Sequence, residues 1–200
     1  MSAFTDVLCF GLTEAKDIVH TLKSNTIEKI VRAYNPYALE MSIKDSKSVL
    51  NTSAIFNVLI GELLFYLSNG DVIGFHAEDM KHSIVAWYEV HQGKQEEECY
   101  FLRDLCSYMR HDDPVYSHKD NLAHIIGNPI TSIKVVVYEK MNEVVRFNDS
   151  SQRGIIIETA KGHMVMSYGL DELPVLAPFT LCQKSDIPQE IWDKATIIEV

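Results

Sequence analysis

Residues 63–75 read LLFYLSNGDVIGF, and residues 155–167 read IIIETAKGHMVMS. Each segment consists of two apolar runs joined at a glycine, and the two glycines, Gly70 and Gly162, are 92 positions apart. Asn69 followed by glycine between apolar runs is a strong hairpin signal, because both residues tolerate positive φ. Each segment is therefore predicted to form a β-hairpin, which makes antiparallel strands the basis of the fold.

A second pair of segments recurs at almost the same distance. Residues 24–43 read SNTIEKIVRAYNPYALEMSI and residues 117–136 read SHKDNLAHIIGNPITSIKVV, so the Asn-Pro pairs that begin at Asn35 and Asn128 are 93 positions apart. A repeat at a fixed period sets the layout of a chain. We therefore expect an α+β protein that is internally duplicated, each half having two helices followed by four to five antiparallel strands.

The expected halves are residues 1–93 and 94–184, followed by a turn and a final strand in residues 185–200. We expect the halves to share one core, since a unit of this size buries little apolar surface alone. Helices are expected at about 13–23, 25–34, 95–110 and 120–126. Strands are expected at 38–43, 52–60, 62–67, 71–78, 83–90, 133–139, 143–147, 154–160, 163–168, 196–200 and, at a sheet edge or a bulge because of its prolines, 174–181.

The composition is that of an acidic globular protein. Of the 200 residues, 28 are acidic and 18 basic, which gives a net charge of −10. This balance argues against nucleic-acid binding, which needs a basic face, and fits an acidic enzyme or a protein that docks on a basic partner. The four cysteines (Cys9, Cys99, Cys106 and Cys182) lack CxxC spacing. This spacing is typical of free thiols in a reducing compartment. The sequence also shows no signal-peptide pattern and no apolar run long enough for a bilayer, so we expect a cytoplasmic location and no membrane partner.

The richest polar segment is RHDDPVYSHKDNLAHI, residues 110–125. Histidines near carboxylates can bind a divalent metal, so one alternative is a metal-dependent hydrolase that uses His111, Asp112, His118 and His124. The other interpretation is a solvent-facing connector between secondary-structure elements. No common nucleotide-binding or zinc signature is present, and no cofactor is expected.

Acidic side chains near aromatic ones suggest a surface that docks on a protein. Carboxylates would pair with lysines and arginines of a basic partner, and large aromatic side chains would anchor the contact. A solvated acidic face is the simpler interpretation of the same residues. The candidate partner-binding residues are Glu96, Glu97, Glu98, Asp104, Asp112 and Asp113, with Trp87 and Tyr108 as aromatic anchors.

In size, acidity, lack of a catalytic motif and expected α+β scaffold, the chain resembles the immunity proteins of bacterial polymorphic-toxin and contact-dependent-inhibition systems. The resemblance implies a non-catalytic cytoplasmic protein that neutralises a cognate toxin domain, often a basic nuclease, by covering its active site. A third possibility is a structural subunit of a homo-oligomer, in which the final strand at 196–200 pairs with a second copy to form a homodimer.

Overall fold

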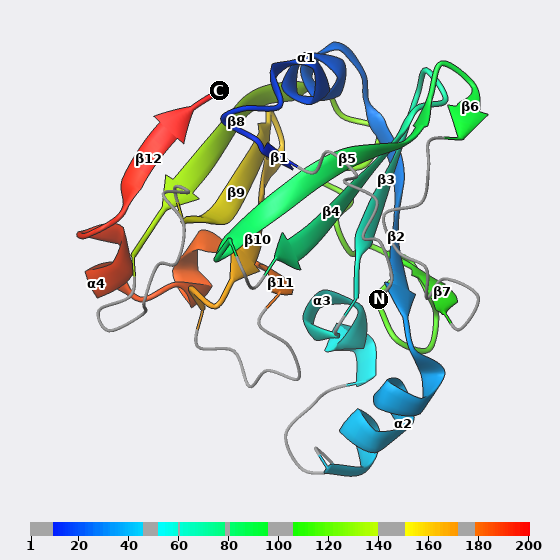
Figure 1. The fold of residues 1–200 in the computed structure, drawn as a ribbon. Coiled ribbons are helices and arrows are strands. Elements are labelled where there is room, and N and C mark those ends of the chain that lie inside the picture. The colour runs from blue at the N-terminus through cyan, green and yellow to red at the C-terminus, as the bar shows by residue number, and fades with distance from the viewer. Residues whose placement is uncertain are drawn as a thin grey trace, which may run out of the picture.

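The computed structural model describes residues 10–45, 52–59, 61–78, 81–95, 106–139, 151–171 and 179–200. Within these ranges the chain is a mixed α+β protein of two antiparallel sheets and a few short helices (Figure 1). No helix of the described part is long and apolar enough to cross a membrane. The helices are α1 (Lys16–Ser24), α2 (Pro36–Asp45), α3 (Ile55–Val58) and α4 (Gln189–Trp192), with the 3-10 turns η1 (Thr52–Ala54) and η3 (Lys184–Asp186).

The first sheet is a meander of four successive strands that is widened at both edges. Its order is β1-β5-β4-β3-β2-β7, and the short β6 pairs with β5 beside this path. All pairings are antiparallel. The strands are β1 (Phe10–Gly11), β2 (Ile27–Tyr34), β3 (Leu63–Leu67), β4 (Val72–Glu78), β5 (Ser83–His91), β6 (Lys94–Gln95) and β7 (Ser107–Arg110).

The second sheet has the order β11-β10-β9-β8-β12, so the last strand of the chain lies beside the first strand of this meander. Its pairings are antiparallel as well. The strands are β8 (Ile130–Val137), β9 (Gln152–Thr159), β10 (Gly162–Tyr168), β11 (Phe179–Cys182) and β12 (Thr196–Glu199).

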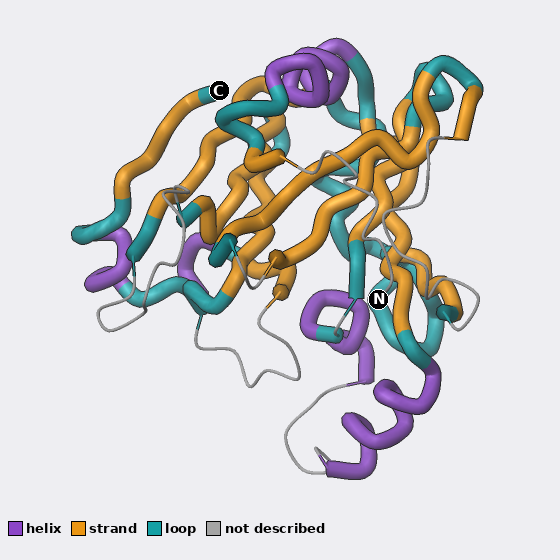
Figure 2. The backbone as a smooth tube through the Cα atoms, viewed as in Figure 1, coloured by secondary structure: helices purple, strands orange, loops and turns teal. Residues whose placement is uncertain are grey.

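One hydrophobic core joins the two sheets. It includes Ile30 and Phe65 from the first sheet and Ile133 and Ile155 from the second. Because side chains alternate along a strand, Ile156 points the other way and belongs to a smaller core on the outer face of the second sheet. Helix α1 packs against β8 and β5 at one end of the sheets, and α3 packs against β11 (Figures 1 and 2).

Both predicted hairpins are confirmed, as β3–β4 and β9–β10. Gly70 (φ +87°) and Gly162 (φ +154°) have positive φ, which favours glycine at each turn. Helix α1, the strands expected at 62–67, 71–78, 83–90, 133–139, 154–160, 163–168 and 196–200, and the turn in 185–194 are also confirmed. Strand β11 is an edge strand, as its prolines predicted, although residues 174–178 lie outside the described part.

A buried arginine connects α3 to the first sheet. Arg32 of β2 is fully buried, and its guanidinium donates to the carbonyl oxygens of Phe56 (2.7 Å), Leu59 (2.7 Å) and Gly61 (3.0 Å). Burial lowers the pKa of Arg32 to about 9, so the group is still a cation at neutral pH. The strand expected at 52–60 is wrong: the segment forms η1 and α3, and its carbonyls at Phe56 and Leu59 accept from Arg32.

Two predictions around Asn35 are wrong. The helix expected at 25–34 is β2, whose β-branched residues pair with β3 on one side and β7 on the other. The strand expected at 38–43 lies within α2, since the Asn35 side chain accepts the backbone N–H groups of Tyr37 (2.9 Å) and Ala38 (3.3 Å). Pro36 therefore begins a helix, where its missing N–H costs nothing, and does not end one.

Two further helices are not found where they were expected. The segment 120–126 consists of turns, and Leu122 has a φ of +60°, which a regular helix does not tolerate. At 95–110, the ends are β6 and β7, and residues 96–105 lie outside the described part. The strand expected at 143–147 also lies outside it.

The described residues do not show the duplicated layout. Asn35 follows a strand and caps α2, whereas Asn128 precedes β8, so the aligned Asn-Pro pairs occupy different places in the fold. Strand β7, which lies beyond the boundary predicted at residue 93, pairs with β2 in the first sheet. The feature common to the two sheets is a meander of four antiparallel strands, β2–β5 in one and β8–β11 in the other.

Candidate functional site

His111, the first histidine of the predicted metal cluster, is buried against β2. Its backbone N–H donates to the carbonyl of Ile30 (2.9 Å), and its Nδ1 accepts the N–H of Ile30 (3.4 Å). The Ser117 hydroxyl donates to the His111 carbonyl. Burial lowers the pKa of the His111 imidazole. These contacts make His111 a neutral side chain that fixes the 111–117 turn to the first sheet.

The other two histidines point elsewhere. His118 is 68% exposed, and its Nδ1 lies 3.7 Å from the equally exposed Asp120. His124 contacts the carbonyl oxygen of His163 through Nε2 (2.8 Å), on the second sheet. In the part of the chain that the structure describes, no three His, Cys, Asp or Glu side chains are grouped so that they could hold a metal ion. The structure thus does not bring together the side chains of the expected metal site.

The two adjacent aspartates are used within their own turn. Asp112 forms a bidentate ion pair with Arg110 (2.9 and 3.0 Å), which lowers the pKa of the Asp112 carboxyl. Asp113 accepts the backbone N–H groups of Val115 (2.8 Å) and Tyr116 (3.0 Å). Hydrogen bonds of both side chains therefore hold the 110–116 turn, and the Asp112 carboxyl is ionised at neutral pH.

The two aromatic anchors have different environments. Trp87 is only 2% exposed, and its indole N–H donates to Glu89 (3.1 Å), so the prediction that it contacts a partner is wrong. It belongs to a small apolar cluster on one face of the first sheet, with Val31 of β2, Leu64 of β3 and Val72 of β4, and Gly74 of β4 leaves room for its ring. Tyr108, in contrast, is 52% exposed on the edge strand β7. The remaining candidates, Glu96, Glu97, Glu98 and Asp104, lie outside the described residues.

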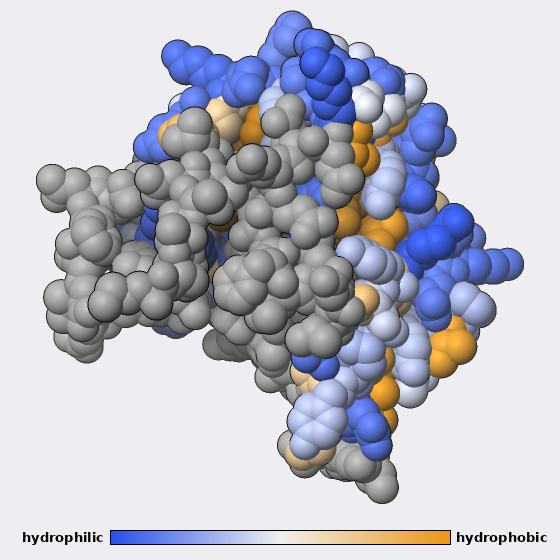
Figure 3. All heavy atoms as spheres, turned by 45° about the vertical axis from the view of Figure 1, so that its right-hand side comes forward, coloured by the Kyte–Doolittle hydropathy of each residue, from blue (hydrophilic) through white to orange (hydrophobic). Residues whose placement is uncertain are grey.

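Two more exposed apolar side chains lie on segments that adjoin β7 and its partner strand β2, and the half-buried Asp112 and Asp113 lie in the turn after β7. Strand β7 pairs with β2, and the next residues after β2 place Tyr37, 71% exposed, in the first turn of α2. Val115, in the turn after β7, is 59% exposed. We call Tyr37, Tyr108, Asp112, Asp113 and Val115 the β7 surface. Figure 3 turns this side of the molecule forward, and its coloured residues show small hydrophobic areas separated by hydrophilic ones.

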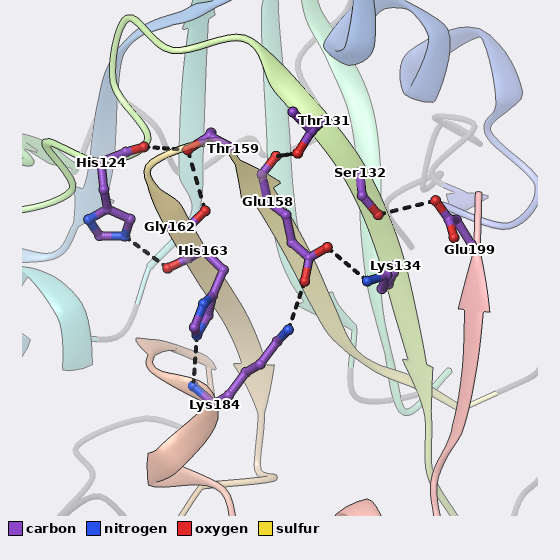
Figure 4. Close-up of polar contacts among 10 residues, drawn as sticks. All are labelled: His124, Thr131, Ser132, Lys134, Glu158, Thr159, Gly162, His163, Lys184 and Glu199. Carbon is purple, nitrogen blue, oxygen red and sulfur yellow. Dashed lines mark hydrogen bonds and ion pairs between the residues drawn. The ribbon is translucent and has the colours of Figure 1, made fainter.

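A polar cluster that the sequence did not reveal lies on the outer face of the second sheet (Figure 4). Glu158 of β9 accepts from Lys134 of β8 (2.8 Å) through one carboxylate oxygen and from Lys184 of η3 (2.7 Å) through the other. These two bonds lower the pKa of Glu158 to about 2, and the Glu158 bond raises the pKa of Lys134. The Glu158 carboxyl is therefore ionised and the ammonium form of Lys134 is stabilised at neutral pH, which suits these groups to hold a charged ligand and not to transfer protons.

Next to this cluster, His124 and Thr159 fasten the β9–β10 hairpin to the 118–127 turns. The Thr159 hydroxyl donates to the His124 carbonyl (2.7 Å), and the His124 ring contacts the carbonyl of His163, as Figure 4 shows. Partial burial lowers the pKa of His163, whose Nε2 accepts a long bond from the backbone N–H of Lys184 (3.5 Å). The histidines here have structural contacts, and no hydroxyl or thiol in these contacts is paired with a histidine base.

The sequence held part of the signal for this cluster. Lys134 and Glu158 interrupt two apolar strands at positions that alternate with core residues, so each was bound to face outward. Their pairing depends on the register of β8 against β9, and the approach of Lys184 depends on the path of the chain after β11. Neither can be read from local sequence.

No family model matches the chain, and neither a curated protein nor a solved structure matches it.

Proposed function

We propose that this chain is a non-catalytic binding protein that contacts a basic protein partner through the β7 surface. The observation that carries the proposal is the exposure of Tyr108 on an edge strand, with Tyr37 and Val115 exposed nearby. Exposed tyrosines supply large contact areas with little conformational entropy to lose, and they are frequent hot spots of protein interfaces.

The fixed side chains of the 110–116 turn support the same proposal. Asp113 is fixed by two backbone N–H groups, and Asp112 by Arg110, so binding does not have to order these side chains. Because Asp112 is already paired, the turn contributes little net charge of its own. Attraction of a basic partner instead comes from the net charge of the whole chain, −10.

The finer part of the proposal follows the resemblance given by size, acidity and fold class. The partner is a toxin domain, the complex forms in the cytoplasm, and the chain neutralises the toxin by covering its active site. Carboxylates of the bound chain occupy the positions that the phosphates of a nucleic acid take on a basic nuclease.

The test uses the polypeptide encoded by the neighbouring reading frame, purified and titrated against this chain. We expect Tyr108→Ala to weaken binding at least tenfold, which is about 1.4 kcal/mol. Phe10→Ala is the matched control, because Phe10 is 39% exposed on β1, at the opposite edge of the same sheet. We also expect the dissociation constant to rise steeply with salt.

Equal losses in the two variants would contradict a role for the β7 surface, and an affinity independent of salt would remove the electrostatic attraction. Metal analysis of the purified protein separates the proposal from the hydrolase alternative. One bound ion per chain that is lost in His111→Ala would overturn the proposal.

A second candidate function, a homodimer formed through β12, is favoured by one observation. All four residues of β12 are exposed, and within the described part of the chain β12 pairs only with β8. An edge strand of this kind can pair with the same strand of another copy. Solution mass tests it: a monomer at high protein concentration rejects the homodimer.

A further inference from the structure

The outer face of the second sheet carries a hollow of about 470 Å³ beside β12. Its volume is within the range of small-molecule sites, roughly 300–1,000 Å³. We call it the outer hollow. Among its lining residues are Lys134, Ile156, Lys184, Gln189, Trp192 and Ile197.

One side of the outer hollow carries two ammonium groups. Lys134 and Lys184 share one carboxylate, Glu158, and a second carboxylate, Glu199 of β12, lies opposite Lys134 in the strand register. Each ammonium has three N–H donors, and among the described residues each donates one hydrogen bond, to Glu158, which leaves donors for a further acceptor.

The other side is apolar and aromatic. Ile156 is buried in the small outer core, and Trp192 packs against that core while its indole N–H donates to the carbonyl of Lys184 (3.2 Å). Ile197 of β12 is 50% exposed at the hollow. The hydrogen bond from Trp192 ties the aromatic side to the backbone that carries one of the two lysines.

We propose that the outer hollow binds a small organic anion with a planar apolar body. Its carboxylate or phosphate lies between Lys134 and Lys184, and its ring packs against Trp192 and Ile197. Charge-assisted hydrogen bonds to an oxyanion and an aromatic contact are the two interactions that this arrangement offers together. The site is independent of the proposed protein contact, because it lies on the other sheet.

The experiment is a calorimetric titration of the intact chain with 2-naphthoate, 2-naphthyl phosphate and the neutral 2-naphthalenemethanol. We expect saturable 1:1 binding of at least one anion and binding of the alcohol that is at least tenfold weaker. The tighter of the two anions identifies the acid group that the site recognises. Quenching of tryptophan fluorescence should accompany binding and be lost in Trp192→Leu, since Trp87 is buried in the first sheet.

Three variants test the assignment of the charges. Replacing both Lys134 and Lys184 with methionine should weaken anion binding at least tenfold, and Glu158→Gln should strengthen it, because a competing carboxylate is removed. Lys161→Met is the matched control, an exposed lysine in the β9–β10 turn, and should change the affinity less than twofold.

The opposite effects expected of the lysine and Glu158 variants cannot both come from a loss of folding. The proposal is overturned if neither anion saturates, if the alcohol binds as tightly as the anions, or if the double lysine variant binds as well as the wild type. Weaker anion binding by Glu158→Gln would also overturn it.

Discussion

Replacing Arg32 with alanine should be among the most destabilising single changes in the chain. The guanidinium has no exposed surface, and it donates to Phe56, Leu59 and Gly61 at 3.0 Å or less. Two of these acceptors belong to α3 and its C-cap, a helix of four residues that is too short to be stable by itself. Arg32 is thus the polar connection that holds α3 against the first sheet.

The size of the loss follows from the hydrogen bonds. A bond from a charged donor contributes about 1.5–3 kcal/mol net, and the low end applies here because burial already disfavours the cation. Three such bonds give about 4.5 kcal/mol. Arg32→Lys keeps the charge but concentrates its donors at one atom, so we expect it to lose about half as much, about 2 kcal/mol.

Urea unfolding, followed by circular dichroism, measures both changes as shifts of the midpoint at constant slope. Arg110→Ala is the control, because Arg110 is 60% exposed and its ion pair with Asp112 should contribute less than about 1 kcal/mol. A loss below 1 kcal/mol in Arg32→Ala would refute the reasoning, since it would mean that the carbonyls find other partners at little cost.

Three further changes have defined outcomes. The pKa of Glu158 is lowered from 4.5 to about 2, so its ion pairs stabilise the fold above pH 4.5 and this stabilisation is lost as the pH falls towards 2. Acid unfolding of Glu158→Gln should therefore show a pH dependence of the unfolding free energy that is smaller by about 1 kcal/mol, after allowance for solvent screening. Gly74→Ala would place a Cβ 2.2 Å from the Trp87 ring, so it should lower the free energy of unfolding by about 2–3 kcal/mol and shift the tryptophan fluorescence. Gly70→Ala is in open space at φ +87°, so it should lower the free energy of unfolding by about 1 kcal/mol and leave the fluorescence unchanged. Asn35→Ala should destabilise the protein by about 1 kcal/mol in urea, and Asn35→Asp should not, because aspartate also caps a helix.

Sequence reasoning succeeded where the signal was local. Asn69-Gly70 and the apolar runs around Gly162 predicted both central hairpins, because turn chemistry and alternation are properties of neighbouring residues. It failed at residues 25–34, where Ile27, Ile30, Val31 and Tyr34 fit a helical spacing. A strand that is buried on both faces shows no alternation, so its pattern does not distinguish it from a buried helix.

The candidate sites divide in the same way. The exposure of Tyr108 was among the expectations, whereas Trp87 was assigned to the surface and is in the interior. The histidines of residues 111–124 are close in sequence, but the turns that follow β7 send them to β2, to solvent and to the second sheet. Proximity along a chain of turns is a poor guide to proximity of side chains in space, since each turn changes the direction of the backbone.

By itself the sequence determined the antiparallel hairpins, the acidic balance and the outward alternation of Lys134 and Glu158, because each depends on residue type and near neighbours. Only the tertiary structure decided that β7 joins the first sheet, that β12 closes against β8 and that Lys184 meets Glu158. Those contacts join residues far apart in the chain, and they form because burying the faces of two sheets in one core selects a single register and path from many that local propensity allows.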